Sequence, residues 1–261
     1  MSTALITGAS GGIGAEFARQ LAARKTNLVL VARSEDKLQQ LAKELQELHK
    51  INVDILVQDL TQPTATEAVF DAVNQKGLTI DLLINNAGFG DYGDFALTER
   101  SRQLQMIQLN ILALVDLTHL FLQGMRSRRS GSIINLASIA AFQPLPYLSV
   151  YAATKAFVLS FSEALWAENK SYGVKILAVC PGPTETNFFT EAKFPSALGG
   201  ANKANYTAVD VVVKQSLKAL EKNQANVVTG GLGNQLVVNA SRFLPRETLV
   251  TAVEKQFKGN E

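Results

Sequence analysis

The chain is poor in the residues that build disulfides and metal sites. Its 261 residues include one cysteine, Cys180, and two histidines, His49 and His119. A single cysteine cannot form an intramolecular disulfide, which agrees with a reducing compartment. Cys180 closes an apolar run and is expected to be a buried structural thiol. The histidines lie far apart without ligand spacing around them, so we expect no metal site.

An excess of charge of one sign is also missing. Lysine and arginine number 25 against 23 aspartate and glutamate residues, for a net charge of +2. The basic residues are scattered, apart from the cluster Arg126-Ser127-Arg128-Arg129, which follows a predicted long helix and would complement its dipole. Nucleic-acid binding requires a basic patch or stripe, so we expect no nucleic-acid partner.

Long hydrophobic runs and targeting signals are absent from the sequence pattern. The start, Met1-Ser2-Thr3-Ala4, lacks the charged region and the following apolar region of a signal peptide. No apolar run reaches the ~18 residues of a membrane span. We therefore expect a cytoplasmic protein without a transmembrane segment. No linker rich in proline, glycine or serine divides the chain, which predicts one domain over residues 1–261.

Apolar strands alternate with amphipathic helices along the chain. Strands are predicted at residues 3–7, 27–32, 53–57, 81–85, 132–137, 174–179 and 225–229. Helices are predicted at residues 15–23, 35–49, 64–74, 98–125, 150–169 and 208–221. Continuous apolar strands separated by helices indicate a parallel sheet covered on both faces. The fold class is therefore α/β, a doubly wound Rossmann-type sheet in three α/β/α layers.

Tyr151 and Lys155 form the most informative pair in the sequence. They lie four residues apart on the helix at 150–169 and so share one face. A free tyrosine titrates near ~10, and a neighbouring positive charge would lower that pKa toward a range useful for proton transfer. Ser138, just beyond the strand at 132–137, could hold a carbonyl oxygen. Taken alone, such a pair also arises by chance on amphipathic helices.

A glycine-rich turn follows the first strand. Gly8-Ala9-Ser10-Gly11-Gly12-Ile13-Gly14 lies between that strand and the first helix, the context of a dinucleotide-binding turn. Glycines let the backbone approach a pyrophosphate, and the helix N-terminus offers unpaired N–H groups. Thr7, Arg33, Asp59, Asn85, Ser138 and Cys180 lie at or just beyond strand ends, where ligands bind in such sheets.

Together these motifs resemble the short-chain dehydrogenase/reductase family in its classical form. The resemblance rests on Thr7-Gly8-x-x-x-Gly12-x-Gly14, Asn85-Asn86-Ala87-Gly88, Ser138, Tyr151-x-x-x-Lys155 and Pro181-Gly182. It implies hydride transfer between a nicotinamide cofactor and a carbonyl or alcohol carbon. It also implies that Tyr151 is the general acid and base, that Lys155 lowers its pKa, that Ser138 orients the carbonyl, and that Asn110 serves a water or proton relay. Asn110 could instead be a buried amide bonded to the backbone.

The choice of cofactor depends on Arg33. A carboxylate at this strand end would bind the ribose of NAD, whereas an arginine followed by Ser34 suits the 2′-phosphate of NADP. The resemblance places Asp59 at the adenine, although it could be a turn aspartate, and Thr184 and Thr186 at the nicotinamide. The expected cofactor-binding residues are Gly8, Ser10, Gly12, Ile13, Gly14, Arg33, Ser34, Asp59, Leu60, Asn86, Ala87, Gly88, Tyr151, Lys155, Thr184 and Thr186.

The expected substrate wall is mostly apolar. It comprises Phe89, Tyr92 and Phe95, the residues between Ser138 and Tyr151, and residues 187–206, which we interpret as a mobile lid. Such a wall favours a hydrophobic or acyl-bearing carbonyl, although core packing explains any one of these side chains equally well. The cofactor half would span about residues 1–135 and the catalytic and substrate half about residues 136–261.

Two questions stay open at this point, the role of the C-terminal tail and the class of the protein. The apolar tail from residue 232 could cover the site, form a subunit contact or touch a membrane surface. The protein could be a catalytically idle NADP-binding sensor or scaffold, or a peripheral membrane protein acting on lipid-like carbonyls. Intact Ser138, Tyr151 and Lys155 favour an enzyme. The resemblance further implies a homodimer or homotetramer.

Overall fold

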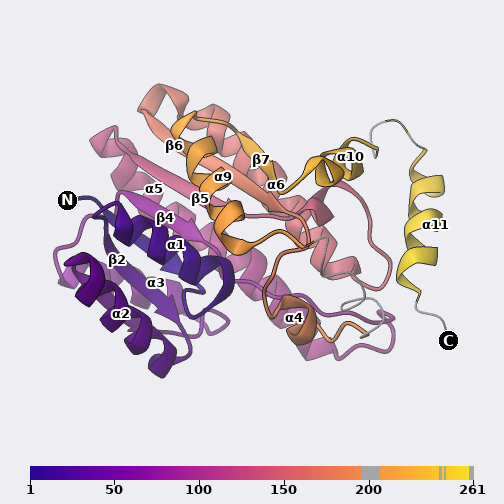
Figure 1. Ribbon diagram of the computed structural model, residues 1–261, viewed down its shortest axis with the longest axis horizontal. Helices are drawn as coiled ribbons and strands as arrows, with labels where there is room; N and C mark the ends of the chain where they lie inside the picture. Colours follow the sequence, from indigo (N-terminus) through magenta and orange to yellow (C-terminus); the bar gives the residue numbers. More distant parts are fainter. Residues whose placement is uncertain (196–205, 241–242, 244, 259–261) are drawn as a thin grey trace.

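The computed structural model describes residues 1–195, 206–240, 243 and 245–258. Its centre is one parallel sheet of seven strands in the order β3-β2-β1-β4-β5-β6-β7 (Figure 1). The strands are β1 (Thr3–Thr7), β2 (Asn27–Ala32), β3 (Val53–Val57), β4 (Leu82–Asn85), β5 (Gly131–Leu136), β6 (Val174–Pro181) and β7 (Asn226–Thr229). The predicted doubly wound sheet is confirmed.

The strand order reverses between β1 and β4, which pair with each other although two further strands separate them in sequence. The chain lays β2 and β3 to one side of β1 and β4 to β7 to the other. At such a switch point the loops after the two central strands diverge and leave a crevice at their carboxyl ends. The turn at Gly8 and the segment at Asn86 both begin at this point, so topology alone places them together.

Helices cover both faces of the sheet. One face carries α1 (Gly12–Ala23), α2 (Glu35–His49) and α9 (Val209–Glu221), and the other carries α3 (Ala65–Gln75), α5 (Leu114–Arg128) and α6 (Ser149–Asn169). Along β1 the side chains alternate between the two cores, Ile6 toward α1 and Leu5 toward α5. Each fully buried aliphatic side chain contributes about 1.5–3 kcal/mol, so a strand that is apolar on both faces is stable only between two helical layers.

The helix predicted at residues 98–125 is more complex than expected. It consists of α4 (Arg100–Ile107), the π-helical stretch η1 (Gln108–Ala113) and α5. π-helical turns are rare and occur mostly at functional sites, and this one contains Asn110. Side-chain periodicity does not distinguish the wider turn from an α-helix.

The continuous helical stretch Arg100–Arg128 has the length and composition of a membrane-spanning helix. By length and composition alone it could cross a membrane, since an 18-residue window within it has a mean hydropathy of 1.4. Its Leu117, Phe121 and Met125, however, are buried in the core on one face of the sheet. A helix that covers a sheet passes the same test of composition, and that is the place of this stretch in the fold.

Short helices and a tail complete the chain. They are η2 (Ile139–Phe142), η3 (Lys170–Tyr172), α7 (Phe188–Glu191), α10 (Leu232–Ala240) and α11 (Arg246–Phe257). Leu249 and Val253 of α11 pack in one cluster with Leu145, Leu148 and Ala152. The tail therefore covers the region around the start of α6, which was one of its three possible roles, whereas Leu232 of α10 is 83% exposed. Residues 196–205 of the expected lid lie outside the described residues.

Candidate active site

The glycine turn is shaped by close backbone contacts. Gly8 has φ +65° and Gly12 φ +53°, left-handed conformations that glycine adopts without strain. A Cβ on Gly14 would lie 2.4 Å from the Gly8 carbonyl oxygen, so a larger residue cannot start this helix so close to β1. α1 has no side-chain cap and no acidic residue in its first turn. Its unpaired N–H groups and positive dipole end fit a pyrophosphate.

Asn86 joins this turn to the end of β4. Its Nδ2 donates to the carbonyl oxygens of Thr7 at 2.9 Å and Gly8 at 3.2 Å. The Thr7 hydroxyl in turn accepts from the backbone N–H groups of Asn86 and Ala87, both at 3.0 Å. Sequence reasoning placed Asn86 in the site but missed the Thr7 hydroxyl, whose only signal was its position at a strand end.

Asn85 ties neighbouring strands together. Its Nδ2 donates to Asn135 Oδ1 on β5 at 2.9 Å and to the Thr118 hydroxyl at 3.0 Å. Asn135 continues the chain of bonds to the Ser162 hydroxyl of α6 at 3.0 Å. Buried polar groups need such partners, and these bonds fix the depth of α6 relative to β4 and β5. Asn135 and Ser162 were missed because contacts between distant strands leave no local pattern.

Arg33 and Ser34 lie at the carboxyl end of β2, next to the glycine turn. Arg33 is exposed, and within the described part of the chain no carboxylate lies within ion-pair distance of it. Ser34 is the N-cap residue of α2, but its hydroxyl makes no capping bond. An exposed guanidinium beside an N-cap hydroxyl that makes no capping bond fits a phosphate group.

Asp59, beyond β3, forms a turn of its own. Its Oδ1 accepts from the backbone N–H of Thr61 at 3.0 Å and from the Thr61 hydroxyl at 2.8 Å. These bonds and the nearby Arg33 outweigh the cost of burial, so the pKa of Asp59 lies below its usual range. Asp59 is therefore a turn aspartate, which was the alternative interpretation. Its lowered pKa keeps the carboxylate charged beside the expected adenine site. The Leu60 side chain is buried in the core, so only its backbone faces that site.

Tyr151, Ser138 and Lys155 meet at the carboxyl ends of β5 and β6. Ser138 begins η2, where its hydroxyl accepts from Ala140 N at 3.1 Å, and it is hydrogen-bonded to Tyr151. The Lys155 Nζ donates to the carbonyl oxygen of Leu136 at 2.7 Å and lies 5.7 Å from the centre of the Tyr151 ring. The three side chains that the sequence proposed as a catalytic group are therefore adjacent.

The electrostatics differ from the sequence-based prediction. Burial raises the pKa of Tyr151 to about 12, and the hydrogen bond with Ser138 opposes that rise. Burial also lowers the pKa of Lys155 to about 8, because removing an ammonium from water disfavours its charged form. The expectation that Lys155 lowers the pKa of Tyr151 is wrong for this state, since desolvation outweighs any attraction. A protonated phenol at neutral pH suits a proton donor.

Asn110 is buried and fully engaged by the protein. Its Oδ1 accepts from Phe89 N at 3.1 Å, and its Nδ2 donates to Phe89 O at 3.0 Å and to the Thr154 hydroxyl at 3.1 Å. A Cβ on Gly88 would lie 2.8 Å from Asn110 Oδ1. Asn110 is therefore a buried amide bonded to the backbone, the second of its two interpretations. Asn110 holds the loop after β4 against α6, and the proposed relay would need a group other than this amide.

The segment after β6 crosses the glycine turn. Thr184 is buried and pairs with Thr207 in an isolated bridge. Thr186 lies against Gly12, where a Cβ would be 3.2 Å from Thr186 Cγ2. The Thr186 hydroxyl accepts from Phe188 N at 3.3 Å and so begins α7. This segment thus connects the expected cofactor turn with the covering helix over Tyr151.

Aromatic rings cover Tyr151. The Phe188 ring lies 5.1 Å from the Tyr151 ring, centre to centre. Further rings extend the contact outward, since Phe189 and Phe194 are 5.0 Å apart and Phe194 lies 5.1 Å from Tyr92. Of the predicted apolar wall, Tyr92, Phe188, Phe189 and Phe194 lie together here, whereas Phe95 is 63% exposed. The side chains of this group exclude water from the phenol and offer an apolar surface to a ligand.

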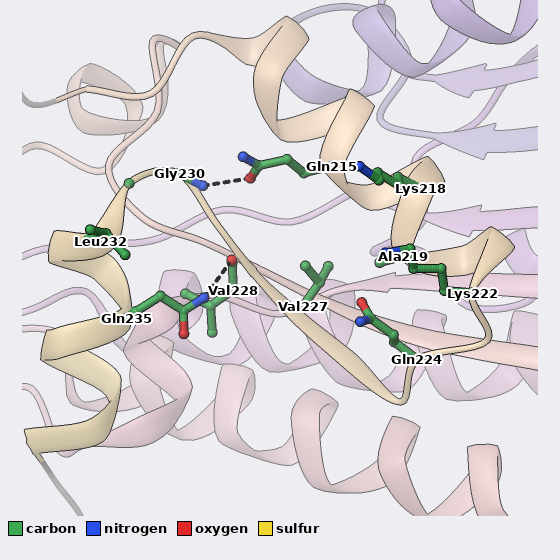
Figure 2. A pocket seen from close by; sticks show the side chains of 11 residues that line it. Gln215, Lys218, Ala219, Lys222, Gln224, Val227, Val228, Gly230, Leu232 and Gln235 are labelled. Atoms are coloured by element: carbon green, nitrogen blue, oxygen red, sulfur yellow. Dashed lines mark hydrogen bonds between the residues drawn. The ribbon is translucent and has the colours of Figure 1, made fainter.

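One hollow in the described residues lies elsewhere. It has a volume of about 330 Å³ at the outer edge of β7, between α9 and α10 (Figure 2). Its lining includes Lys218, Lys222 and Leu232 but none of the four candidate catalytic residues. Gln215 accepts from Gly230 N at 2.8 Å and Gln235 donates to Val228 O at 3.1 Å across its mouth (Figure 2). The candidate catalytic residues therefore place the active site at Tyr151 and not in this hollow.

The fold and the glycine turn define a doubly wound α/β protein with a dinucleotide-binding crevice. Comparison with known proteins identifies the family within this class. The chain belongs to the short-chain dehydrogenase/reductase family of oxidoreductases, since the short chain dehydrogenase family matches residues 2–196.

Two relatives with similar sequences carry different names. The 17-beta-hydroxysteroid dehydrogenase type 3 of Mus musculus is 32% identical over 258 residues, which is 97% of this chain and 80% of the relative. The very-long-chain 3-oxoacyl-CoA reductase of Bos taurus is 36% identical over 184 residues, 68% of this chain. That match spans 58% of the bovine protein.

Solved structures agree with the fold along the whole chain. A short-chain dehydrogenase from Sphingobium yanoikuyae in complex with NADPH is 31% identical, with a TM-score of 0.82 over 100% of this chain and 97% of that one. A 7beta-hydroxysteroid dehydrogenase is 25% identical, with a TM-score of 0.87 over 97% of this chain and 96% of that one.

Proposed function

We propose that this oxidoreductase uses NADPH to reduce the ketone group of a bulky apolar substrate. The observation that carries the proposal is the contact of Tyr151 with Ser138 beside the buried Lys155, under an aromatic cover. When bound, the nicotinamide cofactor would supply or accept the hydride. All further chemistry falls to the side chains of this chain.

In the direction of reduction, Tyr151 would give its phenolic proton to the carbonyl oxygen as that oxygen gains negative charge. Its raised pKa keeps the proton in place at neutral pH until the substrate demands it. Ser138 would donate its hydroxyl proton to the same oxygen and so orient the carbonyl. Lys155, charged below a pH of about 8, would stabilise the phenolate left behind. In oxidation the same residues would work in reverse.

Arg33 and Ser34 support NADP as the cofactor, since both lie at the end of β2 and, among the described residues, no carboxylate is within ion-pair distance of Arg33. A carboxylate at this position would repel a 2′-phosphate, whereas a guanidinium pairs with it. The NADPH held by the relative from Sphingobium yanoikuyae is consistent with this choice.

The aromatic wall supports an apolar substrate. Phe188, Phe189, Phe194 and Tyr92 surround the approach to Tyr151 with rings. The names of the relatives point the same way, to steroids and to very-long-chain 3-oxoacyl-CoA. We therefore propose a ketone on a steroid-like ring system or an acyl chain in preference to a free sugar.

Oxidation of NADPH, followed by absorbance against a 17-keto steroid, a 3-oxoacyl thioester and simple cyclic ketones, tests the proposal. Tyr151→Phe should lower turnover roughly 10²-fold or more, the usual contribution of a positioned acid. Its affinity for NADPH should stay unchanged, because only one hydroxyl is lost. A wild type that binds NADPH but reduces none of these ketones would favour the idle sensor or scaffold instead.

A further inference from the structure

An ion pair with a buried carboxylate lies beside the site, on the loop after β4. The Asp91 side chain is 3% exposed, and its Oδ1 lies 2.6 Å from Arg102 Nε in the first turns of α4. Its Oδ2 accepts from Gln103 Nε2 at 2.8 Å. Arg102 also places its guanidinium 4.9 Å from the centre of the Phe89 ring. A carboxylate removed from water to this extent requires such partners.

The Nη2 atom of Arg102 contacts α7, the helix that covers the site. This nitrogen donates to the carbonyl oxygen of Glu191, the last residue of α7, at 2.7 Å. Two further links run beside it. Tyr92 N donates to Ala192 O at 2.8 Å, and Lys193 Nζ lies 4.0 Å from Asp91 Oδ1. One guanidinium therefore joins the loop after β4, α4 and the end of α7.

This junction determines where Phe188 lies. α7 is a single turn, closed by the bond from Ala192 N to Phe188 O at 2.8 Å, so its end and its start move together. Phe188 lies over Tyr151 in the space left by Gly90. A Cβ on Gly90 would be 2.7 Å from Phe188 Cζ and 3.4 Å from Tyr151 Cδ2. The ring position therefore depends on the anchored end of α7 and on the missing side chain.

We propose that Arg102, held by Asp91, is a positioning residue that docks α7 on the loop after β4 and so keeps Phe188 in place as the wall of the ketone site over Tyr151. The proposal rests on the proposed function of Tyr151. It assigns to an ion pair outside the catalytic group the control of substrate fit.

Arginine is suited to this role because its planar fork makes two bonds in fixed directions. A lysine has one compact ammonium and cannot bond to Asp91 and to the Glu191 carbonyl in the same geometry. Arg102→Lys therefore keeps the charge opposite Asp91 and removes the link to α7. Gly90→Ala should also move Phe188 away from Tyr151, because the added Cβ would clash with the Phe188 ring. In this variant the ion pair of Asp91 and Arg102 stays intact.

The experiment measures the wild type, Arg102→Lys and Gly90→Ala in two ways. Hydrogen–deuterium exchange of peptides covering residues 187–195 reports the docking of α7 without any turnover. Steady-state kinetics at saturating NADPH, with cyclohexanone and benzophenone as probes, report the fit of the ketone. Arg24→Lys is the matched control, since Arg24 pairs with Glu221 on the surface at 2.8 Å.

We expect Arg102→Lys to speed exchange in this peptide about tenfold or more, the equivalent of one lost charge-assisted hydrogen bond. Both site variants should raise KM for the larger ketone by a similar ~10-fold factor, while kcat and the Kd for NADPH change little. Arg24→Lys should resemble the wild type in every measurement. Circular dichroism spectra establish that each variant is folded.

Unchanged exchange at residues 187–195 in Arg102→Lys would overturn the proposal, because α7 would then be docked without Arg102. A fall in kcat at constant KM would also overturn it, since Arg102 would then act on the chemistry. A wild type that reduces neither ketone sinks the proposed function instead, and the exchange data still decide whether Arg102 docks α7.

Discussion

Lys155 Nζ donates to the carbonyl oxygen of Leu136, 2.7 Å away, and so ties the buried ammonium of α6 to the last residue of β5. Tyr151, one turn earlier on the same helix, is hydrogen-bonded to Ser138, two residues beyond Leu136. The three candidate catalytic side chains thus take their positions from one strand end. Fixed positions of this kind are what pre-organised catalysis requires.

The buried ammonium predicts a specific dependence of stability on pH. The pKa of Lys155 falls from 10.5 to about 8 on folding. Between these values Lys155 binds more protons in the unfolded chain than in the folded one, so its contribution to stability rises with pH across this window. Relative to Lys155→Met, the wild type should gain up to about 3 kcal/mol from pH 8 to 10.5. Urea unfolding of both proteins at several pH values measures the difference.

Tyr151 and Cys180, whose pKa rises on folding, are present in both proteins. Cys180 interacts electrostatically with Lys155, so the measured difference reports the titration of Lys155 together with this coupling. Lys37→Met, on the exposed surface of α2, serves as the control and should show no such gain. A constant difference between wild type and Lys155→Met from pH 7 to 10.5 would contradict the low pKa.

Arg33→Asp should move the preference for coenzyme from NADPH toward NADH. The change removes the partner proposed for the 2′-phosphate and adds a repulsive charge, so both effects act in one direction. Loss of a charge-assisted bond is worth ~1.5–3 kcal/mol, so the affinity for NADPH should fall at least about tenfold. Fluorescence titration with both coenzymes measures it, with Arg24→Asp as a control distant from the turn. A wild type that prefers NADH would refute the assignment.

Asn110→Ala should lower the stability of the fold as well as activity. The substitution leaves the N–H and carbonyl of Phe89 and the Thr154 hydroxyl without their partner. Each buried group left unpaired costs about 1–3 kcal/mol, which urea unfolding can resolve. Asn74→Ala, at an exposed position on α3, should change little. If Asn110→Ala lost activity at full stability, the relay role would replace the structural one.

Gly14→Ala and Gly11→Ala should differ sharply in their effects on stability. A Cβ on Gly14 meets the Gly8 carbonyl oxygen at 2.4 Å and Asn86 Nδ2 at 2.5 Å, so α1 or β4 has to shift. Overpacking of this kind costs about 1–3 kcal/mol. Gly11 has an extended φ of 177° and nothing within 4 Å of its Cβ. Thermal unfolding should place Gly11→Ala near the wild type, and equal losses at both positions would show that the contact at Gly14 is not limiting.

Sequence patterns predicted the sheet well because its strands are apolar on both faces. β1, β2 and β3 have the predicted bounds, and α6 begins one residue before the predicted start. Each of these elements is defined by burial that recurs along the chain itself. Tyr151, Ser138 and Lys155 could be placed for the same reason, since strand ends and helix faces determine their neighbourhood.

What the sequence did not reveal depends on contacts between distant segments. α10 and α11 were described only as an apolar tail, although Leu249 and Val253 have the spacing of one helical face. The ion pair of Asp91 and Arg102 requires the path of two loops, which no periodicity encodes. The pKa values of Tyr151 and Lys155 depend on how far each side chain is removed from water, and that follows only from the packed structure.

The glutamine amides at β7 bear on how copies of this protein could assemble. Gln215 and Gln235 occupy the backbone groups of Gly230 and Val228, which an added strand would otherwise use. A strand from another molecule could pair with β7 here only after both hydrogen bonds were broken. Recognition on this side therefore falls to the side chains of α9 and α10, which can discriminate between partners, whereas an open backbone edge accepts almost any extended chain.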